Sequence, residues 1–299
     1  MSTAPRVSIV TVNYNGLTYT RALLHTLEKL TYPNYEVIVV DNASPKEDAS
    51  VLQTEFPWIR YVANPLNEGF AGGNNRGFEI ATGDYYLMLN NDTEVPPGFL
   101  EPLVARFQSD KQIGVVCPKL LYFEQPDIIQ YAGYTPIHPI TGRGHGIGYL
   151  EKDHGQYDRA CQTARAHGAA MMVSKAAFDK VGPMFEDYFL YYEEMDYNAS
   201  ITRAGFTTWY EPASYVLHKE SMSVGADSPM KTYYLSRNRL LYVRRQTPMP
   251  WLPLAVSYHM LIAVPKATLQ LIIQRKWQHL KAYWRGLWWH WSSNPAEKF

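Results

Sequence analysis

Three groups of side chains in this sequence could do chemistry, and the first follows an apolar run. Asn90-Asn91-Asp92 comes directly after residues 85–89, which are almost all apolar. Asp92, with an amide two residues before it, offers the hard oxygen ligands that suit Mg²⁺ or Mn²⁺ on a diphosphate. The alternative is an Asx turn that leads into the following Pro96-Pro97.

The second and third groups are a cluster of carboxylates and a single histidine. Glu193, Glu194 and Asp196 open a segment, 193–204, that is predicted to be a helix closed by Gly205. A helix N-terminus favours an ionised carboxylate, as a general base must be, although ordinary capping charge gives the same pattern. His218 follows an apolar triplet and is either a metal ligand or a structural histidine.

A glycine-rich segment, 69–77, is a candidate for binding an anion. It matches neither GxGxxG nor GxxxxGK[ST], so it lacks the fingerprints of dinucleotide binding and of a P-loop. Glycines before a helix still expose N–H groups to an anion, and Arg76 would add charge, although a plain loop is the alternative. Asp41 ends another apolar run and could accept a hydrogen bond from a base or ribose, or form a turn.

The elements that must position these residues alternate between strand and helix. Buried strands are predicted at 7–12, 37–40, 59–62 and 85–89, and helices at 17–30, 46–56 and 70–81. This alternation predicts an α/β fold with a mainly parallel sheet covered on both faces. Ligands of such sheets bind beyond the carboxyl ends of the strands. Polar clusters fall at those ends: Asn13-Tyr14-Asn15, Asp41-Asn42, 64–67 and 90–92.

Charge is distributed unevenly along the chain. Lys and Arg number 28, as do Asp and Glu, but residues 231–299 hold eleven basic residues against one acid and six of the eight tryptophans. Cationic residues interleaved with Trp favour a membrane interface; a helical cap and a nucleic-acid-binding tail are the alternatives. We expect no nucleic-acid partner, because the remaining 230 residues are net acidic and would repel phosphate backbones.

The most apolar stretch of the chain, 251–273, belongs to this basic tail. It contains Pro253, His259, Pro265, Lys266 and Gln270, which should interrupt a clean span, so an interfacial or re-entrant segment is expected. Two isolated cysteines and an N-terminus without a signal-like apolar region lead us to expect a reducing, cytosolic compartment.

The motifs resemble, in order, those of the family 2 inverting glycosyltransferases with the GT-A fold. Within that family they are most similar to the rhamnosyltransferase-type branch, and the resemblance covers roughly residues 6–245. The motifs that carry it are Val-Asn-Tyr-Asn-Gly, Val-Val-Asp-Asn-Ala-Ser, Asn-Glu-Gly-Phe-Ala-Gly-Gly-Asn-Asn, Leu-Asn-Asn-Asp-Thr, Tyr-Glu-Glu-Met-Asp-Tyr, Arg-Ala-Gly-Phe and Leu-His.

The resemblance implies a role for each residue that binds the donor. Asp41 would read the nucleotide base, and Asn13 and Asn15 would form walls of the nucleotide pocket. The segment 69–77, with Asn74 and Arg76, would lie along the ribose, the diphosphate and the donor sugar.

Further roles concern the metal and the acceptor. Asn90, Asn91 and Asp92 occupy the place of a DxD motif, with Asp92 as metal ligand and His218 joining it. Asn90 replaces the first Asp, so metal dependence could be weaker. Glu194 matches the catalytic base, with Glu193 as a rival, and Glu193 and Asp196 would position the acceptor or the base.

The resemblance also implies an overall function and organisation. The enzyme would transfer a sugar, L-rhamnose from dTDP-rhamnose first and a UDP-sugar second, to a glycan or lipid-linked acceptor in polysaccharide biosynthesis. We expect a catalytic domain over 1–230, with halves at about 1–112 and 113–230, and a helical tail over 231–299 on the cytoplasmic face of the membrane. A metal-dependent sugar nucleotidyltransferase and an inactive glycan-binding scaffold are the alternatives.

Overall fold

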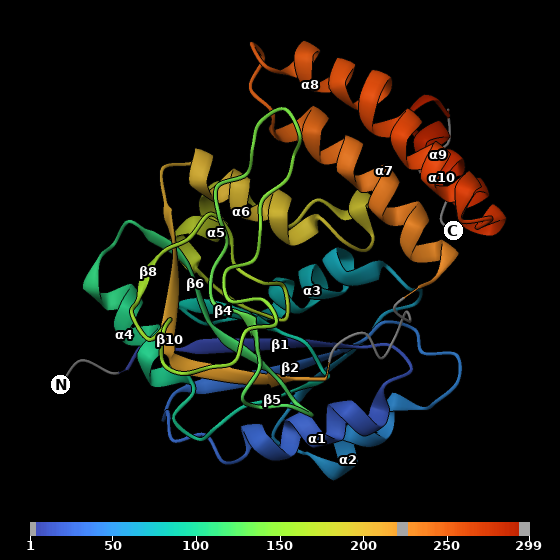
Figure 1. Ribbon diagram of the computed structural model, residues 1–299. Coiled ribbons are helices and arrows are strands. Elements are labelled where there is room, and N and C mark those ends of the chain that lie inside the picture. The colour runs from blue at the N-terminus through green and yellow to red at the C-terminus, as the bar shows by residue number, and fades with distance from the viewer. Residues whose placement is uncertain (1–3, 220–226, 293–299) are drawn as a thin grey trace.

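The computed structural model describes residues 4–219 and 227–292, and one large sheet organises them (Figure 1). Its strands follow the order β3-β2-β1-β4-β9-β6-β10-β5, with β7 paired to β6 and β8 to β10. The strands are β1 Val7–Asn13, β2 Tyr35–Asp41, β3 Arg60–Ala63, β4 Tyr85–Leu89, β5 Thr93–Glu94, β6 Ile113–Tyr122, β7 Ile129–Tyr131, β8 Cys161–Gln162, β9 Ala170–Ser174 and β10 Thr207–His218.

The sheet combines a parallel block with antiparallel pairs at β9 and at the short strands β5, β7 and β8. Strands β3, β2, β1 and β4 form a parallel block, as predicted, and β6 pairs parallel with β10. Strand β9 lies antiparallel between β4 and β6. A parallel connection needs a crossover, usually a helix, and the chain between β6 and β9 contains none, so β9 enters in the opposite direction.

Helices cover both faces of the sheet, and neighbouring tyrosines on β4 show which helix lies where. Tyr85 stacks on Phe107 of α4, whereas Tyr86, on the opposite face, stacks on Phe78 of α3 and meets Phe178 of α5. Helices α1, α2 and α4 therefore lie on one face, and α3, α5 and α6 on the other. Their bounds are α1 Leu17–Leu27, α2 Leu52–Glu55, α3 Gly69–Ile80, α4 Leu100–Ser109, α5 Lys175–Val181 and α6 Glu193–Arg203.

The helix predicted over 46–56 is shorter than expected. A 3₁₀ turn, Ala49–Val51, leads into α2, because the carboxylate of Asp48 accepts the backbone N–H of Ser50 and so fixes the start. Pro57 disfavours the helical conformation at Phe56 and ends it.

The glycine-rich segment 69–77 is mostly helix rather than loop. A Cβ atom on Gly77 would lie 2.3 Å from Cγ1 of Val10, and one on Gly73 would lie 2.8 Å from Cγ1 of Val12. Two of these glycines therefore allow α3 to pack closely on β1, which brings the N-terminus of the helix to the carboxyl end of the sheet.

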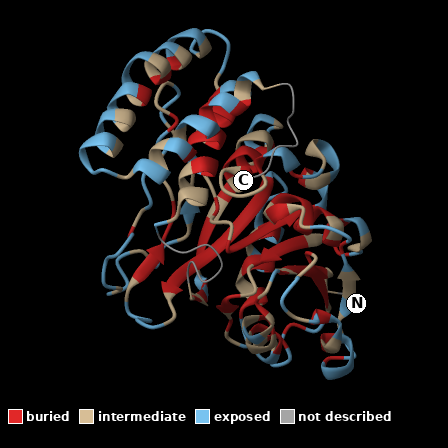
Figure 2. Ribbon diagram, turned by 90° about the vertical axis from the view of Figure 1, so that its right-hand side faces the viewer, coloured by how far each residue is buried: buried red, intermediate tan, exposed pale blue. Residues whose placement is uncertain are grey.

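The C-terminal part of the chain forms further helices on the side of α6. Helix α7 lies between α6 and the last helices of the chain (Figure 1). These last helices are mostly exposed, whereas the strands are buried (Figure 2). The bounds are α7 Pro229–Gln246, α8 Leu252–Tyr258, a π-helical turn His259–Ala263, α9 Val264–Ile273, α10 Trp277–Trp288 and a 3₁₀ turn Trp289–Trp291. The division into domains at residue 230 stays a prediction, and residues 293–299 of the predicted tail lie outside the described residues.

The expectation that prolines interrupt the apolar stretch is wrong. Leu252–Ile273 form one helix of 22 residues, which by length and composition alone could cross a membrane and of which little is buried. Pro253 lies in the first turn, where no N–H is needed. The π-helical turn directly precedes Pro265 and widens the backbone where its ring would otherwise clash.

Candidate active site

A cavity of about 440 Å³ lies at the carboxyl ends of β1, β2 and β4, where the sequence predicts ligand binding. The N-terminus of α3, the segment that follows the 3₁₀ turn Glu186–Tyr188, and the first turns of α7 complete its wall. Of the predicted site residues, the cavity is lined by Asn74, Asn90, Asn91 and Asp92. The other lining residues are Val12, Tyr14, Asn42, Asn67, Gly69, Phe70, Leu89, Phe189, Leu190, Met230 and Tyr234.

Asn13 and Asp41 lie behind this wall and are held together. Asn13 Nδ2 donates to Asp41 Oδ1 at 2.9 Å, and Asn13 Oδ1 accepts from Thr20 Oγ1 at 2.9 Å. Ser44 Oγ donates to the same Asp41 oxygen at 2.6 Å. Asn15, at a φ of 53°, accepts the Lys46 N–H with its side chain. These three predicted residues therefore shape the loops that follow β1 and β2.

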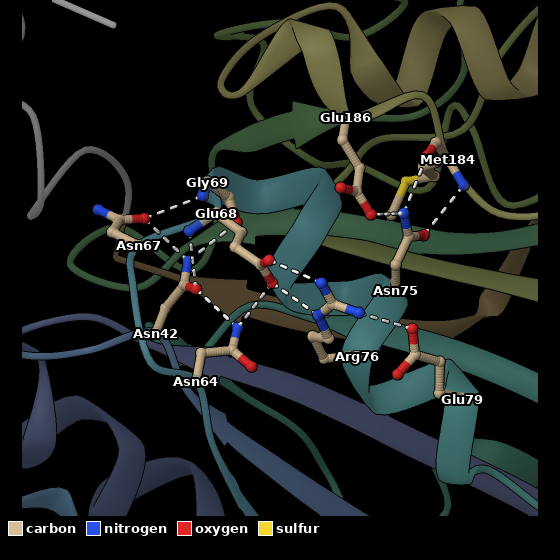
Figure 3. A network of polar contacts seen from close by, with 10 residues as sticks. All are labelled: Asn42, Asn64, Asn67, Glu68, Gly69, Asn75, Arg76, Glu79, Met184 and Glu186. Atoms are coloured by element: carbon tan, nitrogen blue, oxygen red, sulfur yellow. Dashed lines mark hydrogen bonds and ion pairs between the residues drawn. The ribbon is translucent and has the colours of Figure 1, made fainter. Parts of the chain in front are cut away.

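Asn42 organises the turn that leads into α3 (Figure 3). Its Nδ2 donates to Asn67 Oδ1 and to the carbonyl of Gly69, and its Oδ1 accepts from Asn64 Nδ2 and the Glu68 N–H, at 2.9–3.1 Å. Every hydrogen-bonding atom of this buried amide is used. The asparagines that follow β2 and β3 thus fix the backbone at the entrance to the cavity.

Arg76 was expected along the diphosphate, but the structure places it elsewhere. Its guanidinium forms two hydrogen bonds with Glu68, at 2.7 and 2.8 Å, and one with Glu79 (Figure 3). These bonds, those to Glu68 first, raise the pKa of Arg76. Glu68 and Glu79 neutralise the charge of Arg76, which does not line the cavity. In this structure Arg76 therefore stabilises α3 instead of facing a phosphate group.

Asp92 and His218 meet at the edge of the cavity, as predicted. Asp92 Oδ1 is buried 3.2 Å from His218 Nε2 and has no hydrogen-bond partner in the described part of the chain. His218 Nδ1 lies 2.7 Å from Gln130 Oε1, which orients the ring so that Nε2 faces Asp92. An imidazole nitrogen and a carboxylate oxygen that face each other are ligand types that Mn²⁺ and Mg²⁺ accept.

These two ligands do not form a complete protein cage. In residues 4–219 and 227–292, no group of three or more His, Cys, Asp and Glu side chains is placed to hold a metal. A divalent cation here would take its remaining ligands from a bound phosphate group and water, as Mg²⁺ commonly does.

Glu193 and Glu194 begin α6 and lie in different surroundings. Glu193 is buried, its Oε2 has no partner among the described residues, and burial, followed by the charge of Glu194, raises its pKa well above the ordinary value. Glu194 is partly exposed and lies 3.4 Å from Arg165, and a Cβ atom on Gly168 would lie 3.4 Å from its Cγ and 3.7 Å from Cζ of Phe70. Glu194 and the cavity-lining Phe70 therefore both flank Gly168.

Asp196 was predicted to act beside the base, but the structure does not bring it to the cavity. One turn into α6, its buried carboxylate accepts hydrogen bonds from Tyr188 at 2.9 Å, Arg245 at 3.0 and 3.2 Å, and Gln246 at 2.7 Å. The position therefore joins α6 to α7 rather than facing an acceptor.

A strained segment next to the cavity escaped sequence reasoning. Phe189, Tyr191 and Tyr192 all have positive φ values, between 61° and 75°, which aromatic residues rarely adopt. Asn238 of α7 holds them by donating to the carbonyls of Leu190 and Tyr191 and to that of Tyr188. No local sequence signal predicts this conformation, because its cause lies about 50 residues away.

Gln130 and Arg165 also escaped prediction. Gln130 orients His218, and Arg165 contacts Glu194 while its guanidinium stacks 3.9 Å from the ring centroid of Tyr134. Both lie between β6 and β9, in a region without helical or motif signals.

Comparisons with known proteins agree with this architecture. Residues 8–182 match the family model of glycosyl transferase family 2. The chain is 25% identical over 240 residues, 79% of its length and 74% of the other's, to "Low-salt glycan biosynthesis hexosyltransferase Agl10" of Haloferax volcanii. It is 23% identical over 240 residues, 73% of its length and 78% of the other's, to N-acetylglucosaminyl-diphospho-decaprenol L-rhamnosyltransferase of Mycobacterium tuberculosis.

Solved structures share the fold. A mannosyltransferase from Pyrobaculum calidifontis, in complex with GDP-Man and Mn²⁺, aligns with a TM-score of 0.60 at 17% identity, covering 98% of this chain and 89% of that one. GalNAc-T7 with UDP, GalNAc and Mn²⁺ aligns with a TM-score of 0.61 at 18% identity, covering 78% of this chain and 48% of that one. The chain therefore belongs to glycosyl transferase family 2, and it is a glycosyltransferase with the GT-A fold.

Proposed function

We propose that this enzyme transfers a hexosyl residue, with inversion, from a nucleoside-diphosphate sugar to a lipid-linked saccharide. L-Rhamnose from dTDP-rhamnose is the first choice of donor and a UDP-sugar the second. The observation that carries the proposal is the cavity at the strand ends, with the Asp92–His218 pair at one edge and with Glu194 and the cavity-lining Phe70 flanking Gly168. The names of the two relatives guide the choice of sugar and acceptor.

The donor would occupy the cavity with its diphosphate toward Asp92. Beside Asp92 the walls carry amide groups: Asn90 and the second N–H of Asn74 can donate to phosphate and sugar oxygens, whereas Asn91 Nδ2 already donates to Thr20 Oγ1 and the Gly16 carbonyl. Mg²⁺ or Mn²⁺ would be held by Asp92 and His218 Nε2, and when bound it neutralises charge that develops on the leaving diphosphate.

Glu194 would act as the base for the acceptor hydroxyl. A hydroxyl is a weak nucleophile, and a carboxylate that takes its proton during attack lowers the barrier. Glu193 is less suited to this task, since burial raises its pKa and so disfavours the ionised form that a base needs. Attack on the anomeric carbon from the side opposite the diphosphate inverts its configuration without a covalent intermediate on the enzyme.

A panel of nucleotide sugars tests the donor. Thermal unfolding is measured with dTDP-rhamnose, UDP-sugars and GDP-mannose, each with Mg²⁺, with Mn²⁺ and with EDTA. A donor at 100 times its Kd should stabilise the native state by about 2.7 kcal/mol. Stabilisation by dTDP-rhamnose that weakens in EDTA supports the proposal, whereas no response to any nucleotide sugar contradicts it.

We also propose that the chain acts at the cytoplasmic membrane surface, bound peripherally through its C-terminal helices. The basic, Trp-rich composition supports this, as do the exposed side chains of Leu261, Leu269 and Ile273 on one helix. In a flotation experiment at low salt, the full chain should rise with anionic liposomes and remain below with neutral ones. Protein that stays at the bottom of both gradients contradicts the proposal.

A further inference from the structure

A second cavity, of about 620 Å³, lies between α7 and the helices that follow it. Its wall includes Arg239 of α7, His259 of the π-helical turn and Lys266 of α9. Arg143 also belongs to the wall and comes from a loop that is closed by a β-bridge between His138 and Arg143. No carboxylate of the described chain lines it. Three cationic side chains without an acidic one give the cavity a positive potential, which suits an anion.

Unused donors point to the same ligand. Arg239 donates through Nη2 to the carbonyl of Thr141 at 2.8 Å, but its Nε is buried without a partner among the described residues. His259 is 5% exposed, and its Nε2 also lacks a partner there. Burial, with help from Arg239 and Arg143, lowers the pKa of His259 to about 4. A neutral imidazole and two guanidinium groups are the donors that a phosphate group accepts from.

The rim of this cavity is apolar and leads outward. Ile262 belongs to the wall and is 55% exposed, and its neighbour Leu261 is 76% exposed on the same long helix. An anionic group in the cavity would therefore sit beside a surface that fits a hydrocarbon chain. A free anion would make no use of that surface.

The wall of this cavity also includes a residue that is close in the chain to the proposed base. Tyr192 lines the cavity and immediately precedes Glu193 and Glu194 at the start of α6. A group bound beside Arg239 is thus separated from the proposed base by one short stretch of chain. A saccharide attached to that group could extend past Tyr192 toward Glu194.

We propose that this second cavity binds the phosphate groups of the acceptor, an isoprenoid lipid that carries its saccharide through a phosphate or diphosphate. This inference rests on the proposed function for the lipid-linked acceptor. The cationic cavity holds the phosphates, and the exposed helix Leu252–Ile273 contacts the isoprenoid chain. The saccharide leaves the cavity at Tyr192 and reaches the base.

Calorimetry with the full chain in a neutral detergent tests the site, with farnesyl diphosphate as the probe. Inorganic diphosphate and a short-chain phosphatidylglycerol serve as a free anion and a phospholipid headgroup. We expect farnesyl diphosphate to bind at least tenfold more tightly than either, because only it engages both the cations and the apolar rim. Equal affinity for inorganic diphosphate or for phosphatidylglycerol would overturn the proposal.

Three variants locate the binding. Arg239→Gln should weaken farnesyl diphosphate binding at least tenfold, and Arg143→Gln, on an exposed loop that tolerates change, about fivefold. Lys281→Gln removes the same charge from an exposed position of α10 outside the cavity and should change the Kd by less than twofold. Unchanged affinity in Arg143→Gln and Arg239→Gln would place the lipid elsewhere and refute the site.

A donor measurement separates this inference from the proposed function. Binding of the nucleotide sugar should be the same in all three variants, since none of them lines the donor cavity. If wild-type protein binds farnesyl diphosphate but no nucleotide sugar, the proposed function fails while the cationic site stands. If it binds the donor but not farnesyl diphosphate, only the site fails.

Discussion

The polar groups at the ends of β1 and β2 differ sharply from those around α6 and α7. Asn13 and Asn42 are buried with every side-chain hydrogen-bonding atom engaged by neighbouring protein groups. In contrast, Asp92 Oδ1, Glu193 Oε2 and His259 Nε2 are buried without hydrogen-bond partners in the described chain, although Asp92 faces His218. In the first region the protein itself satisfies the buried polar side chains. In the second region some buried polar atoms have no hydrogen-bond partner in the described chain, and a ligand or a proton can satisfy them.

This difference has an energetic meaning. An unsatisfied buried polar atom costs about 1–3 kcal/mol, so proteins carry few of them. Five of the ten in the described chain lie at the Asp92–His218 pair, around the start of α6 or in the second cavity, whereas Arg6 Nε, Thr11 Oγ1, Glu101 Oε2, Tyr210 Oη and Thr268 Oγ1 lie elsewhere. Polar residues at strand ends are therefore an incomplete guide to ligand contacts.

The largest effect should come from the start of α6. Glu194→Gln keeps the size of the side chain but cannot accept a proton, so kcat should fall about 10²–10⁴-fold, with donor affinity nearly unchanged. Glu193→Gln should cost far less, because burial disfavours the ionised form of this carboxyl group. The measurements are kcat for both variants and donor Kd from calorimetry.

The outcome decides between the two carboxylates. If Glu193→Gln is the inactive variant, the base moves by one residue. If neither loses more than a few fold, a general base on this helix is refuted.

The next largest effect concerns the pair at the edge of the donor cavity. Asp92→Ala removes the one carboxylate of the Asn-x-Asp segment and should lower kcat about 10²-fold through the leaving diphosphate. His218→Ala should give a smaller loss, since a neutral imidazole neutralises no charge. Wild-type rates in excess EDTA, or full activity of Asp92→Ala, would rule out metal assistance.

Sequence reasoning predicted most of the sheet and part of the site, for identifiable reasons. Continuous apolar strands and helical spacing are local signals, so β1 to β4, α1, α3 and α6 fall where expected. Asp92 and His218 were paired through a family resemblance, and the structure brings them together.

What was missed depends on distant contacts. Arg76 and Asp196 have the right residue types for a site, but Glu68 and Arg245 bind them, and no local pattern indicates those partners. The unbroken helix over Leu252–Ile273 was missed because a π-helical turn can absorb a proline that propensity alone counts as a break. The roles of Glu194 and of the metal pair stay predictions.

A third experiment tests whether the fully hydrogen-bonded asparagines near the donor cavity act mainly in stability. Asn42→Ala leaves the Glu68 N–H and the Gly69 carbonyl without this partner and removes one of the two acceptors of Asn64 Nδ2, so unfolding free energy should fall by about 2 kcal/mol. Both asparagines line the cavity, but Asn74→Ala loses only one hydrogen bond, to the Phe70 carbonyl, and should weaken donor binding more than stability.

Denaturant unfolding and donor titration are compared for both variants. Equal stability losses would mean that the two asparagines do not differ in role, and the contrast between scaffold and ligand-facing groups would fail on this side of the sheet.

The smallest effect should appear in the pH dependence of stability. Burial raises the folded-state pKa of Glu193 above its unfolded value near 4.5, so the folded protein holds a proton that the unfolded chain releases. Stability from this group is therefore fully present below pH 4.5 and declines as pH rises toward the folded pKa. Glu193→Gln cannot ionise, so its stability should fall less than that of wild type as pH rises above 4.5. Chemical denaturation at each pH measures the difference, and parallel profiles for the two proteins would show that Glu193 is ionised in the native state and available as a base.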